Sequence, residues 1–301
     1  GGFQEVEQMN LFKDMVCYQE EVRDPSRMAE VLNRVIEKAI RGSAPAQINV
    51  PRDYWTQVID IELPPIVRFE RQGGGKDAIQ RAAKMLSDAK FPVILSGAGV
   101  VIGDAINECK ALAEKLDAPV CNGYQHNDSF PGSHPLAVGP LGYNGSKAAM
   151  QLISKADVVL ALGTRLNPFS TLPGYGIDYW PKNANIIQVD MNPDRIGLTK
   201  KVTVGIAGDA KQVAKQIFDK LSSNAGDSGR EDRKNLIHQT KSAWLQTLTS
   251  LDHEDDDPGT VWNKEARERD KDRMSPRQAW RAIQAAMPED AIISSDIGNN
   301  C

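Results

Sequence analysis

The chain has 301 residues, of which 41% are hydrophobic and 25% charged, and its net charge is -4. This composition is typical of a soluble globular protein, and the length suits about two domains. A negative net charge gives no electrostatic reason to expect nucleic acid as a partner, and no apolar run approaches the ~20 residues that a membrane-spanning helix needs. We therefore expect a cytoplasmic protein that binds neither nucleic acid nor membranes.

The cysteines and histidines show no pattern typical of a metal site. The four cysteines include no C-x-x-C pair, and the four histidines lack the i, i+4 spacing of a helical ligand pair. Free cysteines are among the most buried residue types. We expect reduced, mostly buried thiols and no metal bound by these residues.

The first predicted element is a helix that begins near Asp24. Asp24 can cap the helix, Pro25 suits its first turn, and apolar residues recur at helical spacing until Gly42. A short strand over 46–50 follows. The region 56–75 then loses periodicity and contains a Pro-Pro pair and three consecutive glycines, which is typical of a linker.

Residues 76–221 alternate between predicted helices and predicted strands. The strands are short runs of Val, Ile and Leu without polar alternation, as in strands covered on both faces. This alternation predicts an α/β fold with a doubly wound parallel sheet. The predicted helices cover 76–89, 104–116 and 210–221, with a short one opened by Ser146, and the predicted strands cover 92–95, 119–122, 158–162, 186–189 and 202–206.

The composition changes again after residue 221. Residues 222–258 combine a Ser/Gly-rich run, a charged helical segment and an acidic run, which is typical of a solvated connection. A helix is predicted from Ser275, and a strand over 291–295 that ends at Asp296. Because a parallel strand needs a crossover to complete its pairing, we expect the chain to be an internal piece of a longer protein.

A glycine-rich turn follows the strand predicted at 92–95. Gly97 and Gly99 lie between a strand and a helix, a context that suits phosphate binding by backbone amides. The spacing differs from the dinucleotide fingerprint, and Asn122 stands where an acidic ribose-binding residue would end the next strand. Tight packing of the turn is therefore the preferred interpretation over a site for NAD.

Two later turns also carry polar groups at strand ends. Arg165 can pair with phosphate, sulfonate or carboxylate, and a structural ion pair is an equal alternative. Asp190 begins an Asp-Met-Asn-Pro segment that suits either ribose binding or a simple turn. Arg195 and Lys201 are further cations suited to an anionic substrate.

Six segments in order resemble the thiamine-diphosphate enzymes of the acetolactate synthase superfamily. They are GGFQE, APAQINVPRD, PVILSGAGV, ADVVLALGTRL, IIQVDMNP and AIISSDIGNN. The resemblance covers essentially the whole chain and implies a doubly wound central domain flanked by incomplete α/β domains. It implies the C-terminal part of a pyrimidine-binding domain at 1–68, the central domain at 69–222, a linker at 223–274 and the start of a diphosphate-binding domain at 275–301.

Longer segments resemble the sulfoacetaldehyde acetyltransferase family far more closely than the acetolactate synthases. They are NLFKDMVCYQEEVRDPSRM, YQHNDSFPGSHPLAVGPLGYNGSKAAM and LGTRLNPFSTLPGYGIDYWP. Where acetolactate synthases usually carry Thr-Lys-His, this chain has Val16-Cys17-Tyr18, which indicates a different acceptor. The resemblance implies conversion of sulfoacetaldehyde and phosphate to acetyl phosphate and sulfite with thiamine diphosphate and Mg²⁺, in taurine degradation, without a requirement for FAD.

Few site residues are carried over by this resemblance. Phe3 and Gln4 match positions that face the thiazolium and the substrate, although Gln4 could equally be a buried structural amide. Gly298, Asn299 and Asn300 match the turn near the cofactor diphosphate. The family's activating glutamate and magnesium ligands lie outside this sequence, so we expect this chain alone to be inactive.

The resemblance also bears on the central domain and on assembly. Gly97, Gly99 and Arg165 match loops that hold FAD or an adenine nucleotide in some relatives, a site that we expect to be vestigial or regulatory. A homodimer or tetramer is implied. The alternatives that stay open are another thiamine-diphosphate enzyme, such as acetolactate synthase or pyruvate oxidase, and a nucleotide-binding regulatory module.

Overall fold

The computed structural model describes residues 2, 5–65, 70–250, 276–288 and 290–294. Internal contacts divide the chain into two compact units, Gly1–Glu70 and Arg71–Cys301. The division falls inside the stretch 56–75 that the sequence marks as a linker. Within the described ranges, none of the helices combines the length and the apolar character that crossing a bilayer requires.

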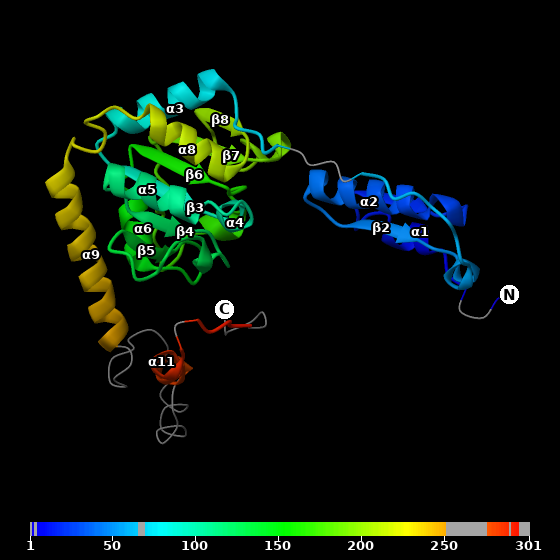
Figure 1. The fold of residues 1–301 in the computed structure, drawn as a ribbon. Coiled ribbons are helices and arrows are strands. Elements are labelled where there is room, and N and C mark those ends of the chain that lie inside the picture. The colour runs from blue at the N-terminus through cyan, green and yellow to red at the C-terminus, as the bar shows by residue number, and fades with distance from the viewer. Residues whose placement is uncertain (1, 3–4, 66–69, 251–275, 289, 295–301) are drawn as a thin grey trace, which may run out of the picture. The chain divides into compact units, whose positions relative to one another are not determined.

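The first unit is built on two parallel strands joined by a helix. Strands β1 (Tyr18–Glu21) and β2 (Ala46–Asn49) pair in register, and helix α2 (Met28–Gly42) connects them (Figure 1). A short helix α1 (Gln8–Phe12) comes before β1, and single 3₁₀ turns cover Pro25–Arg27 and Arg52–Thr56. The predicted cap is confirmed, because the Asp24 carboxylate accepts the N–H of Ser26 at 2.9 Å.

A two-point ion pair joins α2 to β1 in this unit. Arg34 Nε and Nη2 donate to the two carboxylate oxygens of Glu20 at 2.8 and 2.7 Å, and Arg34 Nη1 donates to Glu30 at 2.9 Å. The hydrogen bonds from Arg34 lower the pKa of Glu20 to about 2. The ionised carboxylate therefore stabilises the packing of Val31 and Val35 of α2 against Val22.

The second unit contains a parallel sheet of six strands in the order β5-β4-β3-β6-β7-β8. The chain adds β4 and β5 on one side of β3, then crosses to add β6, β7 and β8 on the other side. This is the predicted doubly wound arrangement, and its order reverses between β3 and β6. The strands are β3 (Pro92–Ser96), β4 (Val120–Asn122), β5 (Ala137–Pro140), β6 (Val158–Leu162), β7 (Asn185–Asp190) and β8 (Val204–Ala207).

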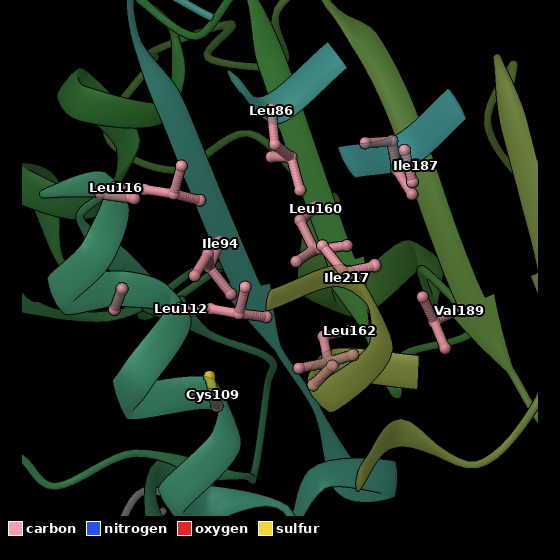
Figure 2. Packing of buried hydrophobic residues seen from close by; sticks show 14 of the residues in the cluster. Leu86, Ile94, Cys109, Leu112, Leu116, Leu160, Leu162, Ile187, Val189 and Ile217 are labelled. Atoms are coloured by element: carbon pink, nitrogen blue, oxygen red, sulfur yellow. The ribbon is translucent and has the colours of Figure 1, made fainter. Parts of the chain in front are cut away.

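Helices cover both faces of this sheet. On one face, α3 (Lys76–Asp88), α5 (Ile106–Leu116) and α8 (Ala210–Lys220) pack against alternate strand residues such as Ile94, Leu160 and Ile187 (Figure 2). On the other face, α6 (Lys147–Ile153) packs against Val93 and Val159. Both faces of β3 and β6 are buried, which explains why their sequences contain no polar alternation.

Some expectations from the sequence are wrong in detail. No strand was predicted between 123 and 143, but this stretch contains β5. Its Gly139 and Pro140 are typical of turns and are tolerated here because the strand lies at the edge of the sheet. The short helices α4 (Ala98–Ile102) and α7 (Pro168–Thr171) were not foreseen either. Residues 291–294 are not a strand, since no strand of the described residues pairs with them, and Ser295 lies outside the described residues. The helix expected from Ser275 is present as α11 (Pro276–Ala286).

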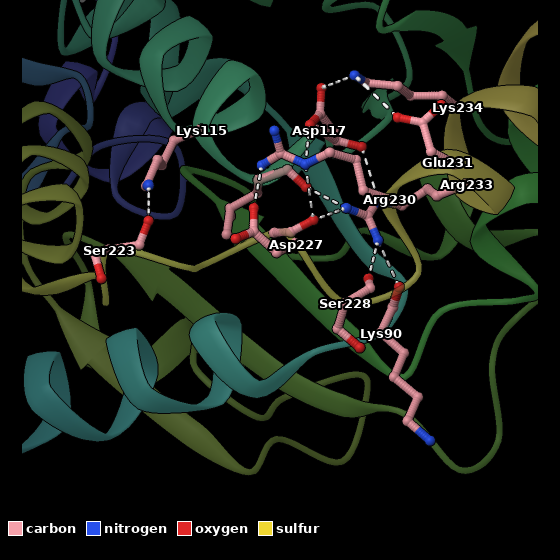
Figure 3. A network of polar contacts seen from close by, with 12 residues as sticks. Lys90, Lys115, Asp117, Ser223, Asp227, Ser228, Arg230, Glu231, Arg233 and Lys234 are labelled. Carbon is pink, nitrogen blue, oxygen red and sulfur yellow. Dashed lines mark hydrogen bonds and ion pairs between the residues drawn. The ribbon is translucent and has the colours of Figure 1, made fainter.

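Helix α9 (Arg230–Ser250), inside the predicted connection, is anchored by the buried side chain of Arg233 (Figure 3). Arg233 is 1% exposed. Its five N–H groups donate to five backbone carbonyls at 2.5 to 3.0 Å, which satisfies every donor of the guanidinium. The acceptors are Lys90, Leu116, Asp117, Gly226 and Ser228. The first turn of α9 is therefore fixed to the ends of three other segments.

Replacing Arg233 with Met should lower the free energy of unfolding by about 3 kcal/mol, because buried carbonyls lose their donors. Urea unfolding followed by circular dichroism measures this change. The matched control is Lys234→Met, since Lys234 is exposed and makes only 3.9 Å ion pairs with Asp117 and Glu231. An effect of Arg233→Met no larger than that of the control would contradict the anchoring role.

The Glu20–Arg34 pair should make the first unit sensitive to acid. Because the pKa of Glu20 is lower in the folded state, its stabilisation is present above pH 4.5 and is lost as the pH falls from 4.5 toward 2. Hydrogen exchange of β1 amides, measured across this range, should accelerate in the wild type and change less in Glu20→Gln. Asp88→Asn, which alters an exposed pair with Lys84, is the control and should leave the pH profile of β1 unchanged.

Candidate functional site at the carboxyl edge of the sheet

The candidate site lies where the order of the strands reverses, at the carboxyl ends of β3 and β6. Open α/β sheets bind ligands at this position, because the loops after the two strands run in opposite directions and leave a crevice. The loop after β3 contains Gly97 and Gly99, and the loop after β6 contains Gly163 and Arg165. The structure therefore brings the predicted Gly97, Gly99 and Arg165 to the same edge.

The two loops touch through their backbones at glycine positions. A Cβ atom on Gly99 would lie 2.7 Å from Gly163 Cα, and one on Gly97 would lie 2.7 Å from the Gly163 carbonyl oxygen. Gly163 has a φ of 62°, a left-handed conformation that favours glycine. Only residues without a side chain allow this approach, so the glycines serve the packing of one loop on the other.

This contact also uses the amides that would otherwise receive a phosphate. The N–H of Gly97 donates to the Leu162 carbonyl at 3.1 Å, and the N–H of Gly99 donates to the Gly163 carbonyl at 2.8 Å. The N–H of Val100 donates back to Gly97. Helix α4, which contains Gly99 and Val100, has only five residues, and it adds little macrodipole to attract an anion.

The loop after β4 is held by a buried polar cluster. Asn122, at the position where a ribose-binding acid would stand, donates from Nδ2 to Ser129 Oγ at 3.0 Å and to the His126 carbonyl at 3.3 Å. Ser96 Oγ donates to the Ser129 carbonyl at 3.1 Å. These side chains fix the loop and present no carboxylate to a ligand.

Gln188, which the sequence analysis did not single out, ties the loops after β6 and β7 together. It is 1% exposed, and its Nε2 donates to the carbonyls of Thr164 and Arg195 at 3.2 Å each. Its Oε1 accepts the N–H of Gly197 at 2.9 Å. The signal that could have found it is a single amide inside the apolar run Ile-Ile-Gln-Val, where an unpaired polar group would be costly.

Arg165 is exposed between two residues in left-handed conformations. Leu166, at φ 53° and fully buried, follows it, and Gly163 precedes it by two residues. Because Gln188 bonds the carbonyls of Thr164 and Arg195, Arg165 and Arg195 stand on adjoining loops. Two guanidinium groups on joined loops provide a positive edge that suits an anion.

The Asp190 turn is held by its own side chains. Asp190 Oδ1 accepts the N–H of Asn192 at 2.9 Å, and Asn192 Oδ1 accepts the N–H of Asp194 at 2.9 Å. This geometry is that of successive Asx turns. One carboxylate oxygen of Asp190 is therefore committed to the backbone.

Several predicted site residues lie outside the described residues. They are Phe3, Gln4, Gly298, Asn299 and Asn300, so the positions that the resemblance assigns to the thiamine cofactor stay predictions. Across the described ranges, no three His, Cys, Asp or Glu side chains come close enough to hold a metal ion. Cys109 and Cys121 are buried, and burial raises the pKa of the Cys109 thiol to about 12, so it is no nucleophile at neutral pH.

Comparison with known proteins identifies the central part of the chain. The thiamine pyrophosphate enzyme central domain family matches residues 79–217, which include the whole edge described above. The chain is also 78% identical over its full length to a probable sulfoacetaldehyde acetyltransferase of Rhizobium meliloti. Residues 79–217 belong to the thiamine pyrophosphate enzyme central domain family.

Two further relatives show that the chain is more similar to sulfoacetaldehyde acetyltransferases than to an acetolactate synthase. The sulfoacetaldehyde acetyltransferase of Roseovarius nubinhibens is 75% identical over 100% of this chain and 50% of its own length, and the Rhizobium protein is matched over 51% of its length. A probable acetolactate synthase large subunit of Methanocaldococcus jannaschii is 34% identical over 83% of this chain and 41% of its own. The chain thus spans about half the length of the curated relatives that it matches.

A solved structure supports the fold alone. The benzoylformate decarboxylase from Polynucleobacter necessarius superposes with a TM-score of 0.59 at 21% identity, over 74% of this chain and 42% of that one. This superposition confirms the predicted α/β fold. The predicted resemblance to a thiamine-diphosphate enzyme is confirmed by the family match and by the relatives.

Gly99→Ala should lower the free energy of unfolding of the second unit by about 1 to 3 kcal/mol, because its Cβ would force the two loops apart. Thermal or urea unfolding measures the change. Gly132→Ala is the matched control, since a Cβ there meets nothing within 4 Å. Equal stabilities of the two variants would show that the loops do not pack through these glycines.

Proposed function

We propose that the full-length protein containing this chain converts sulfoacetaldehyde and phosphate to acetyl phosphate and sulfite. The observation that carries the proposal is the pattern of identities. Three sulfoacetaldehyde acetyltransferases are 78%, 75% and 68% identical across all 301 residues, whereas the acetolactate synthases fall to 34% and below. Identity this high across the whole chain is expected when substrate and reaction are shared.

Thiamine diphosphate and Mg²⁺ are the cofactors that we propose for the full-length protein. When bound, thiamine diphosphate supplies the stabilised carbanion that no side chain provides. Phe3, Gln4 and the turn at 298–300 are the residues of this chain that we propose to stand near the cofactor. We also propose a cytoplasmic homodimer or tetramer.

The described residues contribute a scaffold and a positive edge in this proposal. Both substrates are anionic, and Arg165 and Arg195 are cations of the carboxyl edge that suit a sulfonate or a phosphate. Lys201, the third cation suited to an anion, lies close to the start of β8, toward the amino edge of the sheet. The amides of Gly97 and Gly99 are occupied by carbonyls of the neighbouring loop. We therefore propose that FAD is not required and that the nucleotide site of some relatives is vestigial here.

The test is an assay of the purified full-length protein with sulfoacetaldehyde, phosphate, thiamine diphosphate and Mg²⁺. We expect release of sulfite with equal formation of acetyl phosphate, and loss of both after removal of Mg²⁺ by chelation. Pyruvate offered in place of sulfoacetaldehyde should give no acetolactate. Acetolactate formation without sulfite release would refute the proposal in favour of an acetolactate synthase.

The 301-residue chain tested alone should show no turnover in the same assay. The chain spans about half the length of its relatives, and the family resemblance implies that the activating glutamate and the metal ligands lie outside it. Sulfite release by the isolated chain would show that the residues needed for catalysis lie within this chain, contrary to the proposal.

A further inference from the structure

A pocket of about 760 Å³ lies between α9 and the amino end of the edge strand β5. It is separate from the carboxyl edge, because its lining comes from the residues that start β5 and from the last turns of α5. Its apolar walls are Leu136, Val138 and Ala148 on the sheet side, and Ile237, Trp244 and Leu245 on α9.

The size and lining of this pocket suit a small molecule. Ligand pockets typically have volumes of about 300 to 1,000 Å³ and combine apolar walls with a few polar groups. Leu245 is 60% exposed, so the α9 wall offers apolar surface that the described residues leave in contact with solvent. Arg233 fixes the first turn of α9 (Figure 3), and Lys241 bonds the middle of α9 to the Pro135 carbonyl, so this wall is held in place by the protein itself.

The carboxylates at the rim already have cationic or N–H partners. Glu114 Oε1 lies 3.2 Å from His134 Nε2, and His134 Nδ1 accepts the N–H of Leu136, so the neutral ring carries its proton on Nε2. Asp117 lies 3.0 Å from Arg230 Nε. Glu114 also lies 3.9 Å from Lys110 Nζ, and Asp117 lies 3.9 Å from Lys234 Nζ, so each acid already has a cationic partner within 4 Å.

Lys241 is the cation that lacks such a partner. Its Nζ donates to the carbonyls of Pro135 at 2.7 Å and His134 at 3.4 Å, and both acceptors are neutral. No carboxylate of the described part of the chain forms an ion pair with it. Burial lowers the pKa of Lys241, which is the expected response of an ammonium group placed in apolar surroundings without a counter-charge.

We propose that this pocket binds an amphipathic monoanion, with its carboxylate or sulfonate on Lys241 and its apolar body between Trp244 and Val138. The headgroup would supply the missing counter-charge, and the body would cover the apolar walls. The proposal is independent of the activity proposed above, since none of these residues belongs to the carboxyl edge.

The test is a fluorescence titration of the full-length protein with 8-anilinonaphthalene-1-sulfonate, followed by displacement with decanoate. We expect one saturable site per chain, displaced by decanoate at least about tenfold more effectively than by the neutral 1-decanol, because a charge-assisted bond is lost with the alcohol. Absence of saturable binding, or equal displacement by the two compounds, would overturn the proposal.

Two variants connect the binding to this pocket. Lys241→Met should weaken decanoate binding by about tenfold or more. Leu245→Glu, at an exposed position, should weaken it by placing a negative charge beside the headgroup without disturbing the core. The control Lys215→Met removes an exposed charge on α8 outside the pocket and should leave the affinity within about twofold. Unchanged affinity in both pocket variants would place the binding elsewhere and refute the assignment.

Discussion

The backbone contact between Gly99 and Gly163 determines the character of the central domain. It joins the loops after β3 and β6 at the point where the sheet changes direction, and it commits the amides of Gly97 and Gly99 to carbonyls of the other loop. The amides that a diphosphate would contact are thereby bonded to the protein's own carbonyls. Arg165 is left exposed beside this contact, on a turn with left-handed residues at Gly163 and Leu166.

The rest of the second unit follows from the burial of the strands that carry these loops. Because β3 and β6 are covered on both faces, their ends are fixed, and Gln188 extends the fixed region to the loop after β7. Arg233 fixes α9 in a similar way, because its side chain bonds carbonyls at the end of α5 and just before β3. Helix α9, which the sequence predicts to be part of a solvated connection, thus forms one wall of a pocket.

The sequence predicts the buried, regular parts of this fold and misses features set by distant contacts. The strand at 158–162 is found at its observed bounds because five consecutive buried residues leave a clear signal. Strand β5 was missed because Gly139 and Pro140 are typical of turns. The role of Arg233 could not be inferred, since its five acceptors lie in segments up to 143 residues away and nothing local marks it. The contact between Gly99 and Gly163 could not be predicted either, because it depends on β3 and β6 being neighbours in the sheet.

The most direct test of the central claim is calorimetric titration of the full-length protein with ADP and with FAD. If the loop contact fills the crevice and the central domain serves as a scaffold, neither ligand should give saturable heat at concentrations up to ~1 mM. Saturable binding of either ligand, abolished by Arg165→Met and accompanied by altered exchange of the amides at Gly97 and Gly99, would contradict the account.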